Sequence, residues 1–171
     1  EHFERKRGLG LVREVFNETD ISQLNGSIGI GHTRYPTAGG HDIEDVQPLM
    51  MDAPYSIAIA HNGNLTNHQE LAESLKKMQG ACFTSSIDSE VILHYLVNGL
   101  GAPLQSDEDD VLFFEKICNA VEKIFKEVKG SYSVVATILG QGLLIFRDPH
   151  GIRPLVSGER LNEDGHQEYI F

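Results

Sequence analysis

The feature that most constrains the fold is a change in the spacing of apolar residues at Gly130. Before it, three segments place apolar residues three and four positions apart, which predicts amphipathic helices. After it, four short runs have apolar residues at every second position or in continuous blocks, which predicts strands separated by tight turns. These runs, 131–139, 143–148, 154–160 and 166–171, are expected to form an antiparallel meander.

The first two predicted helices have start and stop signals. One begins with a capping box of the form S/T-x-x-E/Q at Thr66, and Gly80 ends it. The next is capped by Ser86 or Asp88 and ends at Gly99.

The third predicted helix has the clearest pattern. It begins in the acidic run 106–110, since carboxylates suit a helix N-terminus, and it ends before Gly130. Its predicted buried face consists of Phe114, Ile117, Val121, Ile124 and Val128.

Two further strands are predicted before the helices, over 27–32 and 55–60. The first leads into the sequence TRYPTAGG, whose Pro36 and paired glycines predict a loop. The second leads into His-Asn-Gly-Asn at 61–64. Strands, then helices, then strands predict an α+β domain in which helices stack on antiparallel sheets.

The sequence AHNGNL at 60–65 has two interpretations. Asn-Gly is a strong signal for a tight turn, because both residues tolerate a positive φ. Alternatively, the Asn62 side-chain amide and the Gly63 N–H form an oxyanion hole, where negative charge develops during acyl transfer. This sequence by itself leaves both open.

Arg34 and Asp88 also have two interpretations each. Arg34 is an exposed loop arginine or a bidentate clamp on a carboxylate, and Asp88 is a helix N-cap or a partner for an ammonium group. Together they could hold the α-carboxylate and α-amino group of a free amino acid. Asn62 and Gly63 would then polarise the amide at the other end of that ligand.

Composition excludes several classes of function. The net charge of −11 argues against a nucleic-acid partner, which requires clustered Lys and Arg, and no apolar run approaches the length of a membrane span. Two cysteines do not make a disulfide framework, so a cytoplasmic protein is expected. The eight histidines have no metal-binding spacing, so no metal is assigned to this chain.

Four sequences in this order, GHTRYPTAGG, AHNGNL, IDSEVI and RDPHGIRPL, resemble the class II glutamine amidotransferase domain, in the form found in the amidophosphoribosyltransferases. The resemblance implies the N-terminal-nucleophile fold, an αββα sandwich of antiparallel sheets. It also implies that Arg34 and Asp88 bind the α-groups of glutamine, that Thr37 lines its pocket, and that Asn62 and Gly63 form the oxyanion hole. His32 is interpreted as structural, and no catalytic role is assigned to Arg153.

In this family a Cys at the mature N-terminus attacks the glutamine amide, and its own α-amino group acts as the base. Residue 1 is Glu, so residues 1–171 are expected to be a partial glutamine amidotransferase domain, truncated at both ends and inactive alone. The nucleophile segment and a phosphoribosyltransferase domain would lie outside it. The longer protein is expected to be a cytoplasmic homo-oligomer that uses glutamine and phosphoribosyl pyrophosphate in the first step of purine biosynthesis, with Mg²⁺ in the second domain.

Two alternatives to this function remain open. The domain could belong to another class II enzyme, of the glucosamine-6-phosphate synthase or asparagine synthetase type, or it could bind glutamine without hydrolysing it. Ile87 departs from the family pattern, in which a small hydroxyl residue precedes Asp88. Cys82 and Cys118 are expected to be unpaired and away from the site, with Cys118 on the apolar face of the third helix.

Overall fold

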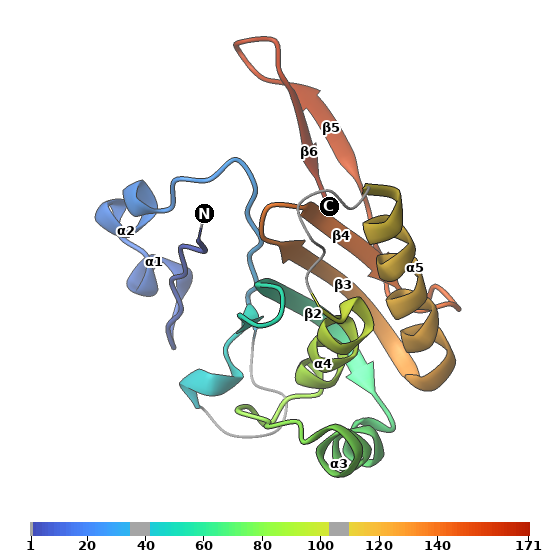
Figure 1. Cartoon of the computed structure of the whole chain (residues 1–171). Helices are drawn as coiled ribbons and strands as arrows, with labels where there is room; N and C mark the ends of the chain where they lie inside the picture. Colours follow the sequence, from blue (N-terminus) through green and yellow to red (C-terminus); the bar gives the residue numbers. More distant parts are fainter. Residues whose placement is uncertain (1, 35–41, 103–109) are drawn as a thin grey trace.

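A computed structural model describes residues 2–34, 42–102 and 110–171 (Figure 1). The helices are α1 (Val12–Val15), α2 (Glu18–Gln23), the 3₁₀ turn η1 (Ile43–Asp45), α3 (His68–Gln79), α4 (Ser89–Leu100) and α5 (Asp110–Glu127). The strands are β1 (Leu49–Met51), β2 (Ile57–Leu65), β3 (Gly130–Ile138), β4 (Gly142–Arg147), β5 (Gly158–Leu161) and β6 (Gln167–Ile170). No helix among these residues is long and apolar enough to cross a bilayer.

Four strands form one antiparallel sheet in the order β1-β2-β3-β4. The predicted α+β class and the antiparallel pairing are therefore confirmed. The long central pair, β2 and β3, runs in register from Ile57 opposite Ile138 to Leu65 opposite Gly130. Strand β1 is much shorter and pairs only with 57–59 of β2, so no strand of the described residues lies beside the remainder of that edge of β2.

The helices α3, α4 and α5 pack together on one face of this sheet (Figure 1). Ile57 and Ile59 of β2 and Ile92 of α4 are fully buried in the core between them. Each such side chain contributes about 1.5–3 kcal/mol by leaving water. The helix α4, buried along most of its length, thereby fixes its N-terminus against β2.

The helix α5 is confirmed, but its buried face differs from the prediction at one end. Phe113 is buried and Phe114 is 65% exposed, whereas Ile124 is buried as predicted. Phe113 and Phe114 are four and three positions from Ile117, so helical spacing accepts either residue. Packing against Tyr55, whose ring centroid lies 5.5 Å from that of Phe113, selects the former.

The predicted capping box at Thr66 is wrong. Helix α3 begins at His68 after Asn67, and the Thr66 hydroxyl donates to the Lys129 carbonyl oxygen instead. Asn67 likewise bonds to the end of α5 and to Lys129. The chain after β2 is therefore tied to the chain before β3 rather than to its own helix. Gly80 ends α3 in the left-handed conformation, as predicted.

The predicted end of the second helix at Gly99 is also wrong, since α4 continues to Leu100 and Gly101 follows it. A Cβ at Gly99 would lie 2.4 Å from the Ala120 Cβ of α5. Gly99 therefore permits the close approach of two helices and does not mark a helix end.

Two predicted strand segments do not form. Residues 27–32 have no strand assignment, because no other described segment pairs with them, and Ile28 is 48% exposed. Residues 154–157 are irregular, so the predicted strand 154–160 is reduced to β5. The four-strand meander is therefore two pairs: β3–β4 belongs to the large sheet, and β5–β6 forms a separate sheet that projects from it (Figure 1).

Candidate functional site

The segment His61-Asn62-Gly63-Asn64 lies within β2 and pairs with β3, so the tight-turn interpretation is wrong. Gly63 has a φ of 155°, and a Cβ there would lie 2.0 Å from the Ser131 backbone oxygen and 2.8 Å from the His61 Nε2. Backbone atoms of a paired strand cannot move aside. Only glycine fits at this position, for reasons of space and of conformation.

The edge of β2 that faces away from β3 is held by two side chains. The Gln47 amide accepts a hydrogen bond from the His61 N–H at 2.6 Å and donates to its carbonyl oxygen at 3.3 Å. Four residues along the strand, the Leu65 N–H donates to Asp88 Oδ2 at 2.7 Å. N–H groups that face one edge of an antiparallel strand recur at every second residue. The Gly63 N–H therefore faces this same edge, between Gln47 and Asp88.

Asn62 points to the opposite face of β2 from His61, because successive side chains alternate. Its side chain is exposed, and among the described contacts no hydrogen bond engages its amide. That amide is available to a ligand. Thr37, the fifth predicted site residue, lies outside the described residues.

Asp88 occupies the N-cap position of α4, but its carboxylate makes no capping hydrogen bond. Oδ2 accepts from Leu65 instead, and Oδ1 lies 3.5 Å from His61 Nδ1, beyond a good hydrogen bond. With 17% of the side chain exposed, Oδ1 keeps acceptor capacity for a ligand. The arrangement suits an ammonium group.

His61 is enclosed beneath this site, with 2% of its side chain exposed. Its Nδ1 lies 3.0 Å from the Ser89 hydroxyl, and Nε2 has no hydrogen-bond partner among the described residues. Burial lowers the pKa of His61, while the Asp88 carboxylate opposes that shift. The imidazole is therefore neutral at neutral pH and packs between Asp88 and Gly63.

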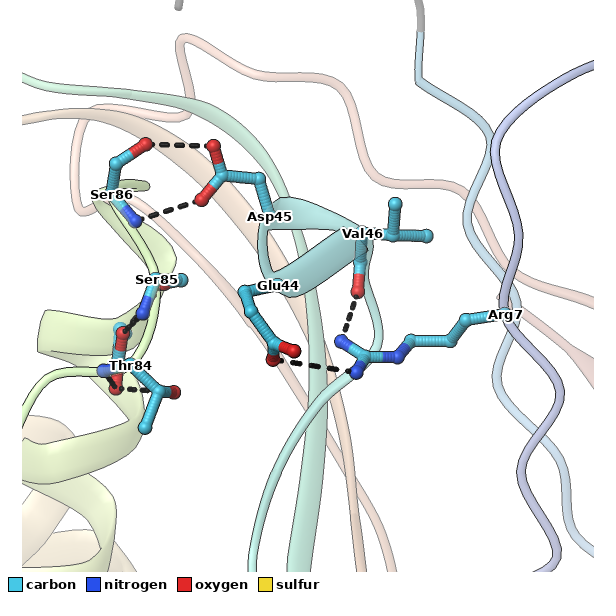
Figure 2. Close-up of polar contacts among 8 residues, drawn as sticks. Arg7, Glu44, Asp45, Val46, Thr84, Ser85 and Ser86 are labelled. Atoms are coloured by element: carbon cyan, nitrogen blue, oxygen red, sulfur yellow. Dashed lines mark hydrogen bonds and ion pairs between the residues drawn. The ribbon is translucent and has the colours of Figure 1, made fainter. Parts of the chain in front are cut away.

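Two buried carboxylates hold the loop that precedes Asp88. Glu90, in the first turn of α4, accepts hydrogen bonds from the backbone and hydroxyl groups of Thr84 and Ser85. Asp45 accepts from the Ser86 N–H at 2.8 Å and from its hydroxyl at 2.7 Å (Figure 2). Both carboxylates are only 3% exposed.

Arg34 is exposed, and no contact among the described residues joins it to Asp88 or Asn62. Two residues earlier, His32 lies near the His61 backbone of β2. Burial lowers the pKa of His32, a hydrogen bond with the His61 backbone opposes this shift, and the nearby Arg34 charge adds to it. Arg34 is thus the site residue that the described contacts fix least.

The motif RDPHGIRPL forms a tight turn around Asp148, which is 2% exposed. Its carboxylate accepts from the backbone N–H groups of Tyr132, His150, Ile152 and Arg153. Burial raises the pKa of Asp148, but these hydrogen bonds outweigh it and the pKa lies below its ordinary value. The part of the motif around Asp148 therefore has a structural role. It joins the end of β4 to β3.

Two cavities lie elsewhere in the described structure. One of about 570 Å³ is lined by β4 and residues 155–157, and one of about 170 Å³ includes Arg5, Arg7 and Glu90. Neither is lined by Arg34, Asn62, Gly63 or Asp88. Cys82 and Cys118 are unpaired as predicted, but Cys118 is exposed and does not belong to the buried face of α5.

Sequence reasoning missed Asp45, Gln47, Glu90 and Asp148. The Asp-Pro pair at 148–149 is a signal for turn initiation and could have identified Asp148. No signal separates Asp45 from the exposed Asp42 and Glu44 in the same acidic segment. Its role depends on Ser86, 41 positions further along the chain.

A family described as "Glutamine amidotransferase domain" matches residues 32–165. The amidophosphoribosyltransferase of Pasteurella multocida is 40% identical over 171 residues, which are 99% of this chain and 32% of that protein. The corresponding enzyme of Saccharomyces cerevisiae is 38% identical over 165 residues, which cover 96% of this chain and 32% of that protein. The chain thus spans about a third of these relatives.

Two solved structures are similar. The "allosteric regulatory enzyme of purine biosynthesis" has a TM-score of 0.68 and 33% identity over 90% of this chain and 30% of that one. The glutamine phosphoribosylpyrophosphate amidotransferase from B. subtilis, complexed with ADP and GMP, has a TM-score of 0.65 and 31% identity, over 91% and 30% of the two chains. These matches confirm the predicted N-terminal-nucleophile type of fold.

Proposed function

The chain belongs to the glutamine amidotransferase domain family, and on this premise we propose that it is the glutamine-hydrolysing domain of an amidophosphoribosyltransferase. The observation that carries the proposal is the open edge of β2. At this edge the Asp88 carboxylate accepts a hydrogen bond from the Leu65 N–H. Gly63 lies two residues before Leu65, and its N–H faces the same edge. One strand thereby carries the oxyanion donors and fixes the carboxylate for the substrate ammonium group.

In this proposal glutamine is held at both ends. Asp88 pairs with its α-ammonium group through Oδ1, Arg34 pairs with its α-carboxylate, and Thr37 lines the pocket. The nucleophile is the thiolate of a Cys at the N-terminus of the longer protein. As it adds to the side-chain carbonyl carbon, the Gly63 N–H and the Asn62 amide stabilise the oxyanion. The α-amino group of that Cys, which has taken up the thiol proton, gives it to the leaving nitrogen, so ammonia departs and a thioester forms. Water then hydrolyses the thioester to glutamate and frees the thiol.

The proposal extends to the longer protein. Ammonia passes to a phosphoribosyltransferase domain, where it reacts with phosphoribosyl pyrophosphate to give phosphoribosylamine, and Mg²⁺ belongs to that domain. No cofactor is assigned to residues 1–171. Two unpaired cysteines support a reducing compartment such as the cytoplasm. Homo-oligomeric assembly is part of the same proposal.

A glutaminase assay tests the proposal. We expect no activity above buffer from residues 1–171 alone, and robust activity when they follow an N-terminal Cys in the longer protein. There, Asn62→Ala should lower kcat by about a hundredfold, the scale for losing one oxyanion-hole donor. Arg34→Ala should mainly raise KM.

Asn64→Ala is the matched control, because Asn64 is exposed on the same face of the same strand. It should retain kcat. Equal losses in the Asn62 and Asn64 variants, or robust activity from residues 1–171 alone, would contradict the proposed chemistry.

A further inference from the structure

We propose that residues 45–47 form a bracket that positions both parts of the glutamine site, the Asp88 carboxylate and the Gly63 N–H. The inference rests on the proposed function. It adds Asp45 and Gln47 as positioning residues, each acting through a different neighbour of the substrate.

One end of the bracket is Asp45, at the end of η1. Both of its carboxylate oxygens are used by Ser86, one by the N–H at 2.8 Å and one by the hydroxyl at 2.7 Å (Figure 2). Ser86 lies two residues before Asp88. Since charge-assisted hydrogen bonds in a buried setting are strong and directional, Asp45 fixes the backbone from which Asp88 projects.

The other end is Gln47, which is 7% exposed. Its side-chain amide engages both the N–H and the carbonyl oxygen of His61, like the backbone of a neighbouring strand. Gly63 lies two residues further along the same edge. The pairing of β1 with β2 stops at Leu49, the first residue of β1. Gln47 takes the place of a paired strand beyond that point, and it fixes the backbone that carries the oxyanion donor.

The bracket is itself anchored between its ends. The Arg7 guanidinium donates to the Val46 carbonyl oxygen at 2.9 Å and lies 3.7 Å from the Glu44 carboxylate (Figure 2). The Arg7 side chain is 13% exposed. This contact holds the peptide between Asp45 and Gln47 in place.

Glu90 cannot replace the bracket, although it also binds the loop before Asp88. It belongs to the first turn of α4 and bonds to Thr84 and Ser85, so it moves with Asp88. Asp88 is also joined to β2 by its bond to the Leu65 N–H and by the contact of Ser89 with His61, but neither of these holds the backbone at Ser86. Asp45 and Gln47 belong to one short segment, and they bond to the loop before α4 and to β2, respectively.

The test compares two substrates in the longer protein: glutamine, and 4-carbamoylbutanoate, which is glutamine without its α-ammonium group. If Asp45 acts through Asp88, Asp45→Ala should raise KM for glutamine about tenfold and leave kcat/KM for the second substrate within about twofold. If Gln47 acts through Gly63, Gln47→Ala should instead lower kcat about tenfold for both substrates.

Three further variants keep the result interpretable. Asp42→Ala is the control, since Asp42 is an exposed acid at the start of the same turn and makes no capping hydrogen bond. Asp45→Asn should restore most of the glutamine KM, because an asparagine can accept from the Ser86 N–H and donate to its hydroxyl. Ser86→Ala, which removes one bond to Asp45 and no charge, should show the same selectivity with a smaller change.

A loss in Asp45→Ala that is equal for the two substrates, or no loss, would overturn the bracket. Asp88→Ala separates this failure from failure of the proposed function. If Asp88→Ala is selective against glutamine and Asp45→Ala is not, the bracket alone is wrong. If Asp88→Ala does not change the preference for glutamine, the assignment of Asp88 to the ammonium group is wrong, and the bracket with it.

Discussion

The strand β2 and the segment 27–32 start from similar sequences and differ in structure. Both alternate isoleucine with small residues, yet Ile57 and Ile59 are fully buried while Ile28 is 48% exposed. In β2 the edge groups meet β1, β3, Gln47 and Asp88, and α4 covers one face. Segment 27–32 has no such partner among the described residues. Alternation defines two faces, and a strand forms only where its edges are paired.

The same contrast divides the proposed site. Asn62, Gly63 and Asp88 belong to the packed sheet and helix layer, where buried side chains hold them. Arg34 follows the exposed segment 27–32. The proposed oxyanion donors thus lie in the packed half of the proposed site. The predictions below compare the packed layer with the more exposed parts of the chain.

The largest expected effect is that of Gly63→Ala. Its Cβ would lie 2.0 Å from a backbone oxygen, in a conformation that alanine rarely adopts. We expect a loss of at least about 3 kcal/mol in the free energy of unfolding, measured by urea denaturation. Gly29→Ala in the exposed segment has no atom within 4 Å of the added Cβ and should be neutral. Similar losses for both would break the comparison.

The second effect is that of removing isoleucine side chains. Ile59→Ala leaves a cavity in the core and should cost about 3 kcal/mol, within the usual range for such changes. Ile28→Ala removes a half-exposed side chain and should change the free energy of unfolding by less than about 0.5 kcal/mol. Urea denaturation of the two variants measures the difference directly, and a large loss for Ile28→Ala would indicate that 27–32 is packed in solution.

The third effect concerns Asp148, which holds four backbone N–H groups in the packed layer. Asp148→Asn should cost about 2 kcal/mol at neutral pH, because it presents an amide group to donors. The control is Asp164→Asn in the exposed turn between β5 and β6, which should be neutral.

The loss at Asp148 should also depend on pH. Its pKa in the folded protein lies below the ordinary value of 3.8. Its stabilising contribution is therefore complete above that ordinary value and disappears as the pH falls through the lower, folded value. Urea denaturation at a series of pH values should show the gap between wild type and Asp148→Asn closing below about pH 4. A gap that is constant with pH would contradict this account.

The smallest effect is expected at the ion pair between Lys6 and Asp20 in the N-terminal part of the chain. The two groups lie 2.9 Å apart, and a hydrogen bond from Lys6 lowers the pKa of Asp20. The pair is partly buried, with 37% of the Lys6 and 16% of the Asp20 side chain exposed, and ion pairs near the surface contribute little and are screened by salt. The change in Tm caused by Lys6→Ala should be smaller than the effects above and should vanish at about 1 M salt. If the change in Tm persists at high salt, the two charges are more shielded from solvent than this prediction assumes.

Sequence alone predicted the three long helices, the strands β2 to β6 to within a few residues, and the residues proposed for the site. It failed at Thr66 and Gly99, where contacts with Lys129 and Ala120 replace the expected local roles. It also failed at 61–64, where a turn and a strand were both compatible with Asn-Gly. In each case the deciding partner lies far along the chain.

The sequence by itself determined the order of helices and strands and the family motifs, because hydrophobic spacing and short motifs are local properties. The tertiary structure decided that His-Asn-Gly-Asn extends a strand, that the Gly63 N–H faces an open edge, and that Asp45 is buried while Asp42 is exposed. These outcomes depend on hydrogen-bond partners supplied 14 to 41 positions away, by Gln47 to His61 and by Asp45 to Ser86. A buried polar group must find a partner, and spacing within a segment does not specify which distant group provides it.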